Sequence, residues 1–193
     1  DVRDPIQRFI EDVAPRLEKI SKEIVADPRT NGGSMFRIYR DVRFSKDKSP
    51  YKTHAAAQFR HASGKDVHAP GSYLHLEPGS VFMGAGRWRP DSPSLANIRR
   101  AIDEDPAAWK RLVGGKAMRE TFTREGESLK RPPRGFDADH PLVDDLRLKD
   151  HILVARFDEG QACDAGFLNL FAQRCRQASK FMAFLAGAND LPW

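Results

Sequence analysis

The spacing of apolar residues changes along the chain from a helical period to a period of two, and then back to a helical period. Near the start, apolar residues recur every three or four positions, which predicts an amphipathic helix over residues 4–24 that bends at Pro15. A second long apolar stripe, from Phe167 to Leu185, predicts a final helix that Asp164 caps. These two helices enclose a central region with a different pattern.

The central region alternates apolar and polar residues, as strands with one buried face do. The pattern predicts strands over residues 36–44, 54–60, 73–77 and 81–85, and a further short strand over 152–157. Because only Pro78, Gly79 and Ser80 separate two of these strands, they should form an antiparallel hairpin. Shorter helices are expected after Pro90 and after Pro106, followed by an extended connection rich in proline and glycine.

These elements predict one α+β domain over residues 1–193, with a mainly antiparallel sheet and helices packed on one face of it. The length of 193 residues and the apolar content of 40% are sufficient for an ordinary core. No apolar run approaches the roughly 20 residues of a membrane span. Cys163 and Cys175 are too far apart along the expected helix to form a disulfide. We therefore expect a cytoplasmic protein without a membrane partner.

The positive charge of the chain is concentrated between residues 37 and 60. This segment holds seven Lys and Arg residues and two Asp residues, so its balance of +5 equals the formal net charge of the whole chain. Concentrated charge attracts anions, and lysines with serines and backbone amides in a loop suit a phosphate or a carboxylate. A solvated loop whose lysines serve only solubility explains the same residues nearly as well. The predicted ligand-binding residues are Arg37, Tyr39, Asp41, Arg43, Lys46, Lys48 and Lys52.

The strands should place several titratable side chains on one face of the sheet. His54 and Gln58 share a face of one strand, and Tyr73, His75 and Glu77 share a face of the next. His54, His75 and Glu77 are the candidate catalytic residues, because a histidine beside a carboxylate can transfer protons. A solvated sheet face is an equally good interpretation of the same residues. A single metal ion at some of His54, His75, Glu77 and Asp41 is a disfavoured alternative, because no HxH or HExxH spacing is present. The sequence therefore predicts no metal site, and it identifies no cofactor.

The leading hypothesis is therefore the binding, with or without turnover, of a small anionic or phosphorylated ligand at the basic loop and the polar sheet face. Nucleic-acid binding is an alternative, supported by an isoelectric point near 9.4 and by the clustered cations. Docking of an acidic protein partner is another alternative, because the same loop would attract it. The sequence leaves enzymatic activity and oligomeric state open.

Several segments of the chain resemble a known protein family. They are residues 37–54, which read RIYRDVRFSKDKSPYKTH, residues 73–79, which read YLHLEPG, residues 84–90, and residues 129–135 with 139–141. Together they resemble the conserved hypothetical proteins grouped as domain of unknown function 2461. No established activity accompanies this family, so the resemblance implies an identity without a mechanism. Members usually carry a further helical segment upstream, so we expect the chain to lack such a segment before Asp1.

Overall fold

A five-stranded antiparallel sheet with the strand order β1-β2-β3-β5-β4 forms the centre of the structure. The computed structural model describes residues 3–43, 46, 48–64 and 69–193. The strands are β1 (Ala55–Arg60), β2 (Gly71–Glu77), β3 (Ser80–Arg87), β4 (Thr123–Glu125) and β5 (His151–Phe157). The described helices are α1 (Arg3–Glu18), α2 (Ser92–Glu104), α3 (Pro106–Gly114), α4 (Lys116–Thr121), α5 (Val143–Leu146), α6 (Glu159–Cys163) and α7 (Phe167–Gly187). The predicted α+β class and the antiparallel sheet are confirmed.

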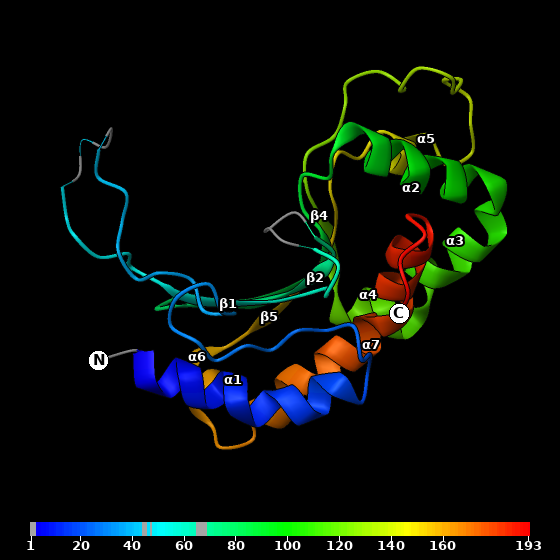
Figure 1. Cartoon of the computed structure of the whole chain (residues 1–193). Helices are drawn as coiled ribbons and strands as arrows, with labels where there is room; N and C mark the ends of the chain where they lie inside the picture. Colours follow the sequence, from blue (N-terminus) through cyan, green and yellow to red (C-terminus); the bar gives the residue numbers. More distant parts are fainter. Residues whose placement is uncertain (1–2, 44–45, 47, 65–68) are drawn as a thin grey trace.

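Helices α1 and α7 run side by side across one face of the sheet, while α2, α3 and α5 gather at one end of it (Figure 1). The apolar stripe of each long helix faces the strands, and Phe171 of α7 packs against Phe59 of β1 with ring centroids 5.5 Å apart. Each such fully buried side chain stabilises the fold by about 1.5–3 kcal/mol. The largest fully buried apolar side chains of these layers are Ile10, Leu17, Phe59, Leu74, Met83, Leu153, Phe171, Phe181 and Leu185.

Local signals in the sequence explain where the shorter helices begin. The carboxylate of Asp91 accepts a hydrogen bond from the amide of Ser94 at 2.7 Å and caps α2. Asp105 caps α3 in the same way through the amide of Ala108, and Pro106 occupies the first turn, where its missing N–H costs nothing. The helices expected after Pro90 and after Pro106 are therefore confirmed.

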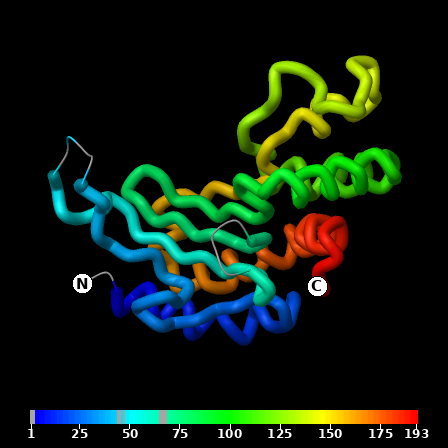
Figure 2. Tube along the Cα trace, turned by 45° about the horizontal axis from the view of Figure 1, so that its top comes forward, coloured from blue at the N-terminus to red at the C-terminus, as the bar shows by residue number. Residues whose placement is uncertain are grey.

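The strand predicted over residues 36–44 is wrong for the part that the structure describes, and Phe44 lies outside the described residues. The described part of residues 37–51, called the arm below, instead folds back on itself and extends from the body of the molecule (Figure 2). Isolated bridges hold the segment, one between Met35 and Ala57 and one between Tyr39 and Tyr51. Alternation alone predicted a strand, but Pro50 has no N–H to donate, so a regular ladder is interrupted there.

The two long helices also differ from the prediction at their ends. Helix α1 ends at Glu18, and Ile24, which the periodicity placed in the helix, forms a bridge with His61 instead. Asp164 does not cap α7 directly, because it is the C-cap residue of the short helix α6, and Gly166 is the N-cap residue of α7. Cys163 and Cys175 therefore lie in different helices, and both are free thiols, as predicted.

Candidate functional site

A cavity of about 620 Å³ lies on the face of the sheet opposite α1 and α7. We call this side the cavity face. Partners directly opposite one another in an antiparallel pair project to the same side of a sheet. Gly84 of β3 pairs with Tyr73 of β2 and with Val154 of β5, so all three belong to the cavity face. The walls of the cavity include Phe36, Tyr73, Phe82, Trp88, Ile152 and Val154.

The cavity exists because glycines replace side chains in the middle of the sheet. A Cβ added at Gly84 would lie 3.9 Å from both Tyr73 and Ile152, an ordinary contact distance, so a side chain there would project into the cavity. Gly86 has a different role. Its φ of 145° is rare for residues with a side chain, and an added Cβ would lie 1.9 Å from the carbonyl oxygen of His151.

A chain of polar contacts runs along β2 beside the cavity. The hydroxyl of Tyr73 lies 3.0 Å from Nδ1 of His75, and Nε2 of His75 lies 3.2 Å from Oε2 of Glu77. The other carboxylate oxygen of Glu77 accepts a hydrogen bond from the hydroxyl of Thr53 at 2.5 Å. The ring of His54 lies 4.6 Å from the ring of His75, measured between centroids. The structure therefore brings together the three predicted catalytic residues, His54, His75 and Glu77.

The surroundings of this cluster favour the uncharged form of His54 and the ionised form of Glu77. Burial lowers the pKa of His54 from its ordinary value, and the nearby charges of His75 and Lys52 lower it further. Hydrogen bonds from Thr53 and His75 lower the pKa of Glu77. Burial raises the pKa of Tyr73, and the charge of Glu77 adds to that effect. At neutral pH the cluster thus combines a neutral imidazole with a carboxylate.

Lys52 lies at the same end of the cavity as His54. Its ammonium group lies 5.8 Å from the centroid of the Phe36 ring, and it pairs with no carboxylate among the described residues. Burial lowers its pKa, with a smaller contribution from the charge of Arg37. A partly buried ammonium without a counterion is a feature of sites that bind anions.

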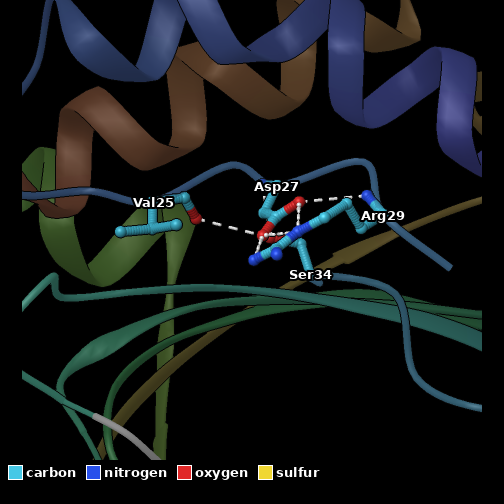
Figure 3. A network of polar contacts seen from close by, with 4 residues as sticks. All are labelled: Val25, Asp27, Arg29 and Ser34. Carbon is cyan, nitrogen blue, oxygen red and sulfur yellow. Dashed lines mark hydrogen bonds and ion pairs between the residues drawn. The ribbon is translucent and has the colours of Figure 1, made fainter. Parts of the chain in front are cut away.

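The segment that leads into the arm fixes the position of Phe36. The hydroxyl of Ser34 accepts a hydrogen bond from the amide of Asp27 at 3.0 Å and donates one to the carbonyl of Val25 at 3.4 Å, while Arg29 pairs with Asp27 (Figure 3). The amide of Phe36 donates to the carbonyl of Ala56. This network attaches the segment to β1, so that Phe36 forms part of the cavity wall.

The remaining predicted ligand-binding residues lie on the arm and do not line the cavity. Asp41 pairs with Arg43 at 2.7 Å and approaches Arg37 at 3.9 Å. Nζ of Lys48 donates to the carbonyl of Val42 at 2.8 Å. The other two positions are exposed: the ring of Tyr39 stacks against the ring of Tyr51, and Lys46 faces solvent. Of the cations predicted to bind the ligand, Lys52 is thus the one at the cavity.

Sequence reasoning missed the opposite end of the cavity, where Glu125, Glu127 and Asp150 line the wall. Arg156 pairs with Glu125 at 2.8 Å, and Lys149 pairs with Glu127 at 2.9 Å. These residues come from the breaker-rich connection and from the loop before β5, so no local alternation pattern links them to the histidines. The one residue that marks this end in the sequence is Gly126. It has a φ of 135° and its backbone lies close to Asp150.

Asp150 holds the rim of the cavity in place. Its carboxylate accepts hydrogen bonds from the amides of Arg89 at 2.7 Å and Glu127 at 3.0 Å. The first of these bonds fixes Arg89 at a φ of 46°, in the left-handed region that side chains rarely adopt. The guanidinium of Arg89 lies 4.7 Å from the ring of Trp88, which is 44% exposed at the cavity rim.

Of the helices in the described part of the chain, none has both the length and the apolar character needed to cross a membrane.

Comparisons with known proteins agree with the resemblance of the motifs. Neither the curated proteins nor the solved structures that we searched include a match to the chain. A family described as conserved hypothetical protein (DUF2461) matches residues 1–184. Because this match covers nearly the whole chain, the protein belongs to that family.

Proposed function

We propose that the protein binds a small organic anion, a carboxylate or a phosphate ester, in the cavity on the cavity face of the sheet. The observation that carries this proposal is the ammonium group of Lys52, which is partly buried at one end of the cavity and lacks a carboxylate partner among the described residues. An anionic group of a ligand would supply the missing partner, and a charge-assisted hydrogen bond of this kind contributes about 1.5–3 kcal/mol.

The charge distribution around the cavity also favours a position of the anionic group of the ligand at the end that holds Lys52. The carboxylates at the far end are already satisfied, Glu125 and Glu127 by ion pairs and Asp150 by backbone amides. The ion pairs offset two of the three negative charges at this end, so most of the repulsion of an anion there is removed. At the near end, the positive charge of Lys52 is uncompensated, so the anionic group should lie beside Lys52 and His54.

The walls favour a ligand with a flat or apolar body. Phe36, Tyr73 and Phe82 border the near end, and Ile152 and Val154 border the middle. The volume of about 620 Å³ is in the range of small-molecule sites, about 300–1,000 Å³. In the proposed complex His54 is positioned to exchange a proton with the ligand, because its neutral imidazole lies between Lys52 and the pair of His75 and Glu77.

A thermal-shift screen with phosphorylated and carboxylated metabolites tests the proposal, followed by calorimetry on the compounds that stabilise the protein. The variant Lys52→Met should lower the affinity for a stabilising anion at least about tenfold. The matched control is Lys48→Met, which removes a lysine of the arm and should change that affinity less than about twofold. Equal losses in the two variants would show that the arm binds the anion and would contradict the proposal.

The same pair of variants separates the cavity from the two alternatives. Binding of nucleic acid or of an acidic protein would use the arm, so its affinity would fall in Lys48→Met and would fall steeply with added salt. The ion pair of Arg43 with Asp41 reduces the charge that the arm offers to such partners. We also propose a cytoplasmic location, because both cysteines are free thiols, as is usual in a reducing compartment.

A further inference from the structure

Three side chains with metal-ligating atoms meet beside the cavity. The donor atoms of His54, His75 and Glu77 all lie within 4.8 Å of one another. The register of the sheet produces this arrangement. His75 and Glu77 are two residues apart on β2, and His75 pairs with Ala56, so His54 faces the same side as both of them. The backbone pairing therefore places all three residues on one side of the sheet.

The spacing of two of the donors already suits a metal ion. Donors about 2.0–2.1 Å from a tetrahedral zinc ion lie about 3.3 Å from one another. Nε2 of His75 and Oε2 of Glu77 are 3.2 Å apart. His54 precedes β1 and is only half-buried, so it is the member that must turn toward the other two.

Further residues orient these donors. Metal-bound histidines usually donate their second ring N–H to a neighbouring acceptor, which fixes the ring. Here the hydroxyl of Tyr73 lies 3.0 Å from Nδ1 of His75. When an ion binds Nε2, the proton of His75 would stand on Nδ1, and the Tyr73 hydroxyl could accept it. Thr53 donates to one oxygen of Glu77, which leaves the other oxygen toward His75. The side chain of His75 is only 12% exposed, so it enters the site already ordered.

We infer that His54, His75 and Glu77 bind a divalent transition-metal ion of the zinc type, through two imidazole nitrogens and one carboxylate oxygen. This inference goes beyond the proposed anion site and does not depend on it. Two histidines with one carboxylate is a donor set of zinc sites that keep an open position. Because His54 is a wall of the cavity, the open position would face the cavity.

The charges near His54 indicate which kind of ligand would fill the open position of the metal ion. Lys52 and Arg40 are close enough to influence His54, and both disfavour a bare cation there. An anion in the open position would offset that repulsion, because it would contact the ion and Lys52 together. HxH and HExxH patterns do not describe this donor set, because His54 precedes β1 whereas His75 and Glu77 lie on β2.

The test is a titration of chelator-treated protein with zinc chloride by calorimetry, and with cobalt chloride by visible absorption. We expect one ion per chain and a cobalt spectrum typical of low coordination number. His54→Ala, His75→Ala and Glu77→Gln should each lower the affinity for zinc at least about tenfold. The matched control is His140→Asn, which removes a histidine that pairs with Asp103 of α2 and should leave zinc binding unchanged.

Two results would overturn the inference: wild-type protein that takes up no stoichiometric zinc, or His54→Ala with wild-type affinity. His54 is only partly buried, so its replacement should leave the protein folded, and the melting temperature of each variant checks this. The variant Lys52→Met separates this site from the anion site, because it should keep stoichiometric zinc binding. Zinc uptake without any anion binding would contradict the proposed function alone, and anion binding without zinc uptake would contradict this inference alone.

Discussion

Gly84 lies opposite Tyr73 in the sheet, and the missing side chain at Gly84 gives the Tyr73 ring an open space to face. The same strand carries Gly86, which is required for a different reason, the close approach of the His151 carbonyl. Two glycines of one strand therefore have separable roles, one in forming the cavity and one in forming the fold.

The first prediction follows from this difference. Gly84→Val should fill part of the cavity without a clash, so the melting temperature should stay close to that of the wild type while stabilisation by anions is lost. The paired variant Gly86→Val should lower the free energy of unfolding by about 3 kcal/mol or more, because its backbone cannot avoid the carbonyl. Urea denaturation and thermal shift measure both effects. Undiminished anion binding in Gly84→Val would show that the anion binds outside the cavity and would contradict the proposal.

The second prediction concerns the dependence of stability on pH. His151 is buried, neither ring nitrogen has a hydrogen-bond partner among the described residues, and burial lowers its pKa to about 4. Between pH 4 and 6.5 the unfolded chain then binds a proton that the folded chain does not, so stability rises with pH across this window. The expected loss on acidification from pH 6.5 to 4 is about 3 kcal/mol from this residue.

The variant His151→Leu tests the origin of that loss, since leucine fills the site without a titratable group. Its free energy of unfolding, measured with urea at several pH values, should depend less on pH over the window and should exceed that of the wild type at pH 5. A slope in His151→Leu equal to that of the wild type would assign the effect to other groups.

The third prediction concerns the rim of the cavity. Asp150→Ala removes the acceptor of two backbone N–H groups, those of Arg89 and Glu127, and should lower the free energy of unfolding by about 2–4 kcal/mol. Asp150→Asn keeps one acceptor oxygen and should cost less than the alanine variant. Urea denaturation gives both values. If the two variants were equally stable, the carboxylate would not be what holds Arg89 in its left-handed conformation.

The fourth prediction distinguishes the two thiols. Cys163 is exposed, whereas burial raises the pKa of Cys175 to about 12, so Cys175 should carry almost no thiolate at pH 8. A thiol-reactive chromogenic reagent should therefore modify one cysteine per native chain quickly, and both cysteines after unfolding in urea. Cys163→Ser should abolish the fast reaction. Rapid modification of a native Cys163→Ser protein would show that α7 opens readily.

How far the sequence predicts the structure depends on whether the signal is local. The hairpin of β2 and β3 follows from alternation on either side of Pro78 and Gly79, and Gly79 adopts the positive φ of 77° that its turn requires. The arm has the same alternation but does not form a regular strand, because alternation does not show whether a neighbouring backbone is available for pairing. The gathering of His54 with His75 and Glu77 was predictable once β1 and β2 were paired in register.

The acidic end of the cavity was not predictable in this way. Glu125 and Asp150 meet there because β4 pairs with β5, and this pairing joins segments that are distant in sequence. The strand β4 contains three residues, which is too short for a period to be recognised. Whether the predicted residues bind an anion or transfer a proton stays a prediction.

Having both long helices on a single side of the sheet has a consequence for how the family can diversify. Residues that stabilise the molecule, such as Met83, and residues that border the cavity, such as Phe82, occupy alternating positions of the same strand. Substitutions at every second position can therefore reshape the cavity while the helix-packed interior keeps its composition. Relatives with the same scaffold are free to differ in the walls of this cavity.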